Sequence, residues 1–182
     1  MLKRLCADLP ILSQPMTARM LIACVLLVGL FNSAPAEDED AALFTIRVLT
    51  LEAALELAQA GLDDCRKRGY QVAVAVVDRF GNVQVTLRDR FAGPHTPQTA
   101  ARKAWTAVSF RTDSLSLAEL TRSGAPASGI RHVGNALMVG GGRTVDAEGS
   151  IVAGIGISGG PSGAADDACA QAAIEALTER LM

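Results

Sequence analysis

The spacing of apolar residues changes along the chain, and each spacing predicts a different kind of element. Between Leu51 and Cys65 apolar residues recur in steps of three and four, which is typical of a helix with one buried face. Thr50 precedes this stretch as a candidate N-terminal cap, and Gly69 follows it as a candidate terminator. A first helix is therefore expected between these two residues.

The next apolar stretch predicts a β-hairpin. Residues 72–77 form a short run of Val and Ala, which is typical of a buried strand. Residues 78–82 contain the turn formers Asp, Gly and Asn, and Val83, Val85 and Leu87 then alternate with polar residues. This alternation predicts a half-exposed strand that pairs with the first one.

Two more helices are expected in the middle of the chain. Thr96 followed by Pro97 is a favourable cap and first position for a helix with an alanine-rich apolar side. We expect Arg102 and Lys103 to point away from that apolar side. Asp113 is a candidate cap for a shorter helix that follows.

The last third of the chain predicts a loop, two strands and a helix. Residues 123–134 contain Gly, Ala, Pro and Ser and are expected to form a surface loop. Residues 136–139 predict a short strand that runs into three glycines, and residues 146–149 predict a turn. Residues 151–157 predict a strand that contains glycine, and residues 164–181 predict the last helix.

The predicted order of elements is α-β-β-α-α-β-β-α. Two hairpins with helices before, between and after them favour an antiparallel sheet covered on both faces. The fold class expected from the pattern is therefore an α/β sandwich of the α+β kind, with a central antiparallel sheet flanked by helices.

The chain begins with a segment that we do not expect to belong to the folded domain. Residues 20–31 are almost entirely apolar, but a membrane span needs about 20 residues. They are typical of the hydrophobic region of a signal peptide, with Arg19 before them and small residues at 34–36 for cleavage. We therefore expect a signal peptide at residues 1–36, with Met16 as the better candidate for the true start.

Cleavage would leave an acidic N-terminal segment at residues 37–48 and a single domain at residues 49–182. The protein is then expected in the periplasm or outside the cell, with no stable membrane insertion; an uncleaved N-terminal anchor is the alternative. An oxidising compartment permits one disulfide between Cys65 and Cys169. Both cysteines lie on apolar helix faces, so two buried thiols are an equally good interpretation.

Several classes of function are disfavoured by the sequence. A formal net charge of −2 with scattered Lys and Arg gives no electrostatic footprint for nucleic acid. Residues 154–159 match the spacing of a dinucleotide-binding fingerprint, but too little chain follows for a βαβ unit. These glycines instead favour a close approach of strand and helix backbones. No nucleophile elbow with a later histidine is present, and we predict no catalytic residue.

His95 is the most informative single residue. It lies in a Gly-Pro loop directly before a predicted helix, so its imidazole is expected to be accessible and able to ligate iron or a corrinoid metal. The alternative is a loop histidine that helps to position the start of the helix. His132, in the loop at 123–134, is a weaker candidate of the same kind, and Thr96 serves either as a cap or beside a ligand.

Four ordered stretches resemble the GlcG/HbpS-like family, which also includes the C-terminal domain of PduO-type proteins. The resemblance runs from about Leu49 to the C-terminus. Each stretch is weak alone, but their order makes the set fairly specific. They are residues 74–78 with Gly81 and Asn82, residues 102–110, residues 140–142, and residues 154–159 with Asp166 and Asp167.

The resemblance implies a profilin-like sandwich, homo-oligomers, and binding of haem or, in the PduO case, of corrinoids. Residues 92–96 are similar to the loop-to-helix junction of the exported, haem-linked branch. The implied cofactor-binding residues are His95, Thr96, Arg102 and His132, with His95 as the metal ligand. In many relatives a Pro-Ile-type pair follows the glycine run, whereas Arg143 and Thr144 follow it here. If this part of the strand lines the pocket, the ligand preference would differ.

The leading hypothesis is an exported haem-binding protein for haem storage, transfer or sensing. The second is an enzyme that degrades haem or consumes peroxide, and no cluster of acid and base side chains gives it independent support. The third is a module that binds a corrinoid or another small molecule.

Overall fold

The first described helix forms where the apolar spacing predicts it. The computed structural model describes residues 42–182, and the expected signal peptide and the start of the acidic segment lie outside them. The hydroxyl of Thr50 accepts a hydrogen bond from the amide of Ala53, which caps this helix. The elements of the unit Ile46–Met182 are α2 (Leu51–Lys67), β1 (Ala73–Asp78), β2 (Val83–Arg88), α3 (Thr96–Phe110), α4 (Ser114–Leu120), the 3₁₀ helix η2 (Ser128–His132), β3 (Gly142–Ala147), β4 (Ser150–Ser158) and α5 (Gly163–Leu181).

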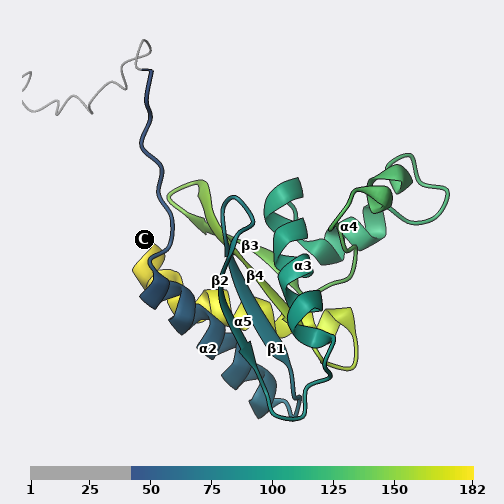
Figure 1. The fold of residues 1–182 in the computed structure, drawn as a ribbon, viewed down its shortest axis with the longest axis horizontal. Helices are drawn as coiled ribbons and strands as arrows, with labels where there is room; N and C mark the ends of the chain where they lie inside the picture. Colours follow the sequence, from purple (N-terminus) through teal and green to yellow (C-terminus); the bar gives the residue numbers. More distant parts are fainter. Residues whose placement is uncertain (1–41) are drawn as a thin grey trace, which may run out of the picture. The chain divides into compact units, whose positions relative to one another are not determined.

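The strands form one antiparallel sheet in the order β2-β1-β4-β3, so the two hairpins meet at the central pair β1 and β4. Helices α2 and α5 cover one face, and α3 covers the other (Figure 1). The predicted fold class, an antiparallel sheet flanked by helices, is confirmed. None of the helices within residues 42–182 is long and apolar enough to cross a membrane.

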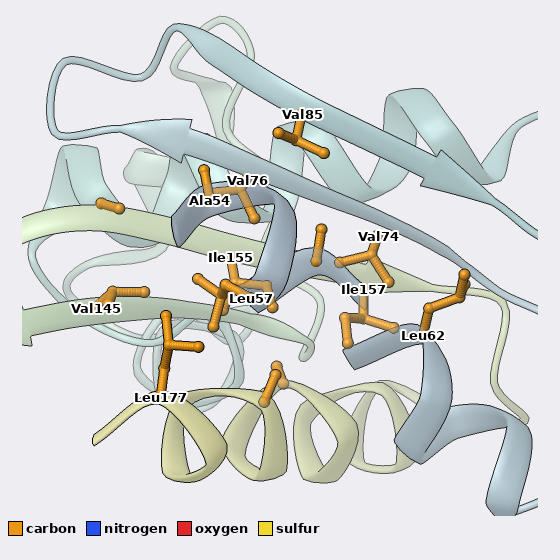
Figure 2. Packing of buried hydrophobic residues seen from close by; sticks show 14 of the residues in the cluster. Ala54, Leu57, Leu62, Val74, Val76, Val85, Val145, Ile155, Ile157 and Leu177 are labelled. Atoms are coloured by element: carbon orange, nitrogen blue, oxygen red, sulfur yellow. The ribbon is translucent and has the colours of Figure 1, made fainter. Parts of the chain in front are cut away.

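The main hydrophobic core lies between the sheet and the two helices α2 and α5. Alternating strand residues such as Val74, Val76, Ile155 and Ile157 point into it and meet leucines from both helices. Figure 2 shows this packing, with Leu57 and Leu62 from α2 and Leu177 from α5.

A disulfide between Cys65 and Cys169 links α2 to α5 inside this core. The two Cα atoms lie 5.5 Å apart, and both residues are fully buried. Of the two alternatives that the sequence left open, the structure has the disulfide.

On the opposite face of the sheet, glycines take the place of larger residues under α3, so the helix backbone approaches the strands closely. A Cβ atom at Gly156 would lie 2.0 Å from the carbonyl oxygen of Ala100, and one at Gly142 would lie 2.1 Å from that of Lys103. This confirms close packing of strand and helix backbones at Gly154 and Gly156, whereas Gly159 meets the backbone of Gln71.

Gly156→Ala is expected to lower the free energy of unfolding by about 1–3 kcal/mol, because α3 must move away from the sheet. Urea unfolding of the two proteins measures the change. Gly129→Ala is the matched control, since a Cβ atom there meets nothing within 4 Å. Equal midpoints for Gly156→Ala and the wild type would contradict the packing role.

The strand predicted at residues 136–139 is wrong, because β3 begins only at Gly142. Ala136 and Met138 are buried against Leu117 of α4 and not in the sheet. Their backbone is held by side chains, since the amide of Leu137 donates to the Thr106 hydroxyl. The short apolar run that suggested a strand is therefore explained by packing against α4.

The predicted helix starts are correct within a residue, but two capping roles are not. Thr96 is the first residue of α3 and His95 is its cap; the Thr96 hydroxyl donates to the carbonyl of Gly93. Asp113 precedes α4, yet its carboxylate accepts from the amide of Thr144 instead of capping the helix. The partner of Asp113 is distant in sequence, whereas the partner of Thr96 lies three residues before it.

Candidate ligand cavity

A cavity of about 720 Å³ lies at the end of the sheet where β4 ends and α3 and α5 begin. This volume is in the usual range for small-molecule sites, about 300–1,000 Å³. Its walls come from four separate parts of the chain. The first is residues 69–71 before β1, and the second is Phe91, Gly93, His95, Thr96 and Thr99 together with Lys103 of α3. The third is Val139, and the fourth is residues 158–163 with Asp166 of α5.

Strand pairing brings these segments together. Ala73 at the start of β1 pairs with Arg88 at the end of β2 and with Ser158 at the end of β4. The segment before β1 and the segments after β2 and β4 therefore meet at one end of the sheet. The contact is close, since a Cβ atom at Gly159 would lie 2.6 Å from the carbonyl oxygen of Gln71.

Asp89 fixes the segment that precedes β1. Its carboxylate is buried and accepts hydrogen bonds from the Arg66 guanidinium at 2.9 Å and from the amide of Val72 at 3.3 Å. The hydrogen bond to Asp89 raises the pKa of Arg66, so the guanidinium stays charged. The end of α2 is thus tied to the chain that forms this wall of the cavity.

A buried ion pair forms the floor of the cavity. The Nζ atom of Lys103 lies 2.7 Å from a carboxylate oxygen of Asp166 and also donates to the carbonyl of Ile157 at 2.9 Å. The second carboxylate oxygen of Asp166 accepts from the amide of Gly160. The prediction that Lys103 points away from the core is wrong: its side chain is only 1% exposed, because Asp166 compensates its charge.

Three polar residues of α3 share the face toward the cavity. Thr96, Thr99 and Lys103 follow one another at helical spacing and all line it. The Thr96 hydroxyl donates to the carbonyl of Gly93, and the Thr99 hydroxyl donates to that of His95. The helix start that the sequence singled out therefore presents a polar face to the cavity.

His95 lines the same cavity from its outer side. It is exposed, and its imidazole makes no hydrogen bond with any other residue in the range 42–182. A Cβ atom at Gly93 would lie 2.7 Å from the ring, so the absence of a side chain at Gly93 leaves room for the imidazole. Nδ1 faces Gly93, at 2.9 Å from that Cβ position, whereas Nε2 lies 3.8 Å from it and is the ring nitrogen available for a ligand.

The family model described as "Haem degrading protein HbpS-like" matches residues 49–175, most of the chain. The chain belongs to this HbpS-like family. Streptomyces reticuli HbpS, as a double mutant, has a similar structure, with a TM-score of 0.71 and 41% identity over 80% of this chain and 97% of that one. A PduOC haem complex is also similar, with a TM-score of 0.67 and 32% identity over 71% of this chain and 94% of that one.

Curated relatives of this HbpS-like chain include a longer protein, the corrinoid adenosyltransferase PduO of Salmonella typhimurium. It is 34% identical over 124 residues, which are 67% of this chain and 37% of PduO. The HbpS-like chain thus spans well under half the length of that relative.

The HbpS-like structure brings together two of the four predicted binding residues. His95 and Thr96 both line the cavity. Arg102 instead donates to the carbonyls of Asn135 and Ala136, and His132 is exposed in η2. Neither residue lines the cavity.

Arg143, the departure from the family pattern, also lies outside the cavity lining. Its guanidinium binds both carboxylate oxygens of Asp167, at 3.2 and 2.8 Å, and pairs with Asp113. It therefore ties β3 to α5 and to the start of α4. No group of three or more His, Cys, Asp or Glu side chains able to hold a metal occurs within residues 42–182.

Proposed function

We propose that this protein binds haem in the cavity, with the His95 imidazole as the ligand to the iron. The observation that carries the proposal is the free imidazole of His95 at the wall of a cavity of about 720 Å³. Membership of the HbpS-like family and the likeness to a PduOC haem complex support it.

The surroundings of His95 suit a flat apolar ring with a polar edge. Phe91 is 80% exposed and Val139 is 41% exposed, and both line the cavity. A ring that covers them gains about 25 cal/mol per Å² of apolar surface removed from water. When bound, haem supplies an iron centre, and a neutral imidazole is a common protein ligand for that iron. The chain supplies the imidazole, the apolar contacts and the orientation.

Haemin titration of the purified protein tests this proposal. We expect a saturable Soret shift for the wild type and for His132→Ala, the control, because His132 lies outside the cavity. His95→Ala is expected to weaken haemin binding by at least about tenfold and to change the ferric spectrum, because it removes the imidazole that would bind the iron. An unchanged spectrum and affinity in His95→Ala would rule out His95 as the ligand.

Haem degradation is the second candidate function, and the family description favours it. We propose storage, transfer or sensing first, because Lys103 and Asp166 are paired with each other, so neither is placed as a free acid or base in the cavity. Loss of the Soret band with release of iron and a linear tetrapyrrole, in the presence of a reductant, would favour degradation. The relation to PduO makes a corrinoid the alternative ligand, and a cobalamin titration under the same conditions tests it.

We also propose that the protein is exported and acts in the periplasm or outside the cell. The apolar segment at residues 20–31 supports export, and so does the disulfide, since disulfides persist in oxidising compartments. N-terminal sequencing of the protein from cell fractions tests this, with a start after Ala36 as the expected result.

A further inference from the structure

Ser158 is a buried polar residue that faces the cavity. It is only 5% exposed, and its hydroxyl makes no hydrogen bond with another side chain or backbone group of residues 42–182. Ile155 and Ile157 of β4 point into the core under α2 and α5. Because strand side chains alternate, Ser158 points to the opposite face, toward α3 and the cavity. Among residues 42–182 the one fully buried side-chain oxygen without a partner is Oε1 of Gln84, so the Ser158 hydroxyl opens to the cavity, where a ligand can accept its hydrogen bond.

Lys103 offers a second donor beside it. Its ammonium has three N–H groups, and the carbonyl of Ile157 and the carboxylate of Asp166 accept two of them. Within the described chain, no group accepts the third, and Lys103 lines the cavity. Asp166 balances the charge of Lys103, so the donor remains available without an uncompensated buried charge.

The N-terminus of α5 adds an electrostatic field that favours an anion at the same place. Ser162 caps this helix of 19 residues, and Ser162 and Gly163 line the cavity. The N-terminus of a long helix carries a partial positive charge that stabilises an anion. Asp166 in the first turn and Asp167 after it do not cancel this charge, because Asp166 is paired with Lys103 and Asp167 with Arg143.

We infer that Ser158, the third N–H group of Lys103 and the start of α5 form a carboxylate subsite within the cavity. The inference rests on the proposed haem binding, and the group that the subsite takes is then a propionate of haem. The hydroxyl of Ser158 and the third N–H group of Lys103 donate to the carboxylate, and the start of α5 stabilises its negative charge. His95 and this subsite together fix the orientation of the ring in its plane.

Comparison of haemin with haemin dimethyl ester tests the inference, because esterification removes both carboxylate charges. We expect the wild type to bind haemin about tenfold more tightly than the ester, as for a hydrogen bond to a charged group. Ser158→Ala is expected to weaken haemin about tenfold and to leave the affinity for the ester within about twofold. Both probes are added from the same dimethyl sulfoxide stock.

Ser150→Ala is the matched control, since Ser150 begins the same strand, is exposed and does not line the cavity. It is expected to bind both probes as the wild type does. Equal affinity of the wild type for haemin and its ester, or an equal loss for both probes in Ser158→Ala, overturns the subsite but not haem binding. Failure of the wild type to bind either probe overturns both. The wild-type comparison needs no variant, so it stands even if Ser158→Ala folds poorly.

Discussion

Lys103→Met is expected to destabilise the protein by about 3–5 kcal/mol, because it breaks a buried ion pair by removing one partner. The ammonium of Lys103 is buried and holds the carboxylate of Asp166 and the carbonyl of Ile157. Methionine fills a similar volume but leaves Asp166 as a buried charge without its partner. Urea unfolding of the two proteins measures the loss.

Two further variants show whether the buried charge is the cause. Lys103→Met combined with Asp166→Asn removes both charges, so most of the lost stability is expected to return. Arg68→Met breaks the more exposed pair with Asp64 and is expected to cost far less stability than Lys103→Met. A loss below about 1 kcal/mol in Lys103→Met would contradict the role assigned to the pair.

Removal of the disulfide is expected to lower the free energy of unfolding by about 2–5 kcal/mol. Cys65 and Cys169 are 104 positions apart, so the bond closes a long loop and restricts the unfolded chain strongly. The double variant Cys65→Ala, Cys169→Ala should therefore unfold at a lower concentration of guanidinium chloride. Its denaturant dependence should also be steeper, because an unfolded chain without the bond exposes more surface.

A reductant provides the internal control for this prediction. Dithiothreitol is expected to shift the unfolding midpoint of the wild type toward that of the double variant, and to leave the double variant unchanged. Because both cysteines are fully buried, the reductant acts when the protein opens, so samples must be equilibrated through unfolding. Coincident curves for the wild type and the double variant would show that the bond contributes no stability.

Most of the fold could be predicted because its elements carry their own periodic patterns. The stripe of α2 and the alternation of β2 depend on residues that are neighbours in sequence. The strand predicted at residues 136–139 is wrong because a short apolar run also arises where a loop is buried against α4. The true strand β3 carries the charged Arg143, whose partner Asp167 is distant in sequence. A local pattern cannot distinguish these two kinds of burial.

The cavity was predicted only where its residues are marked locally. His95 and Thr96 stand out because a Gly-Pro loop meets a helix start there. Lys103 follows Arg102 in the sequence and looks like a second surface charge, since nothing nearby indicates that Asp166 will pair with it. Lys103 lies three residues after Ala100, and this helical spacing places both residues on the same side of α3. This spacing is the one signal in the sequence that could have suggested the burial of Lys103. The unpaired hydroxyl of Ser158 is a property of the folded chain alone.

The pairing of Ala73 with Ser158 makes the cavity depend on contacts between distant parts of the chain. The walls of the cavity come together only when the centre of the sheet joins two hairpins that are distant in sequence. Contacts between distant segments form slowly, because a large loop must close first. A partly synthesised or partly folded chain therefore has no cavity, and a ligand stabilises the whole sheet instead of one loop. The thermal midpoint should consequently rise with ligand concentration as one cooperative transition.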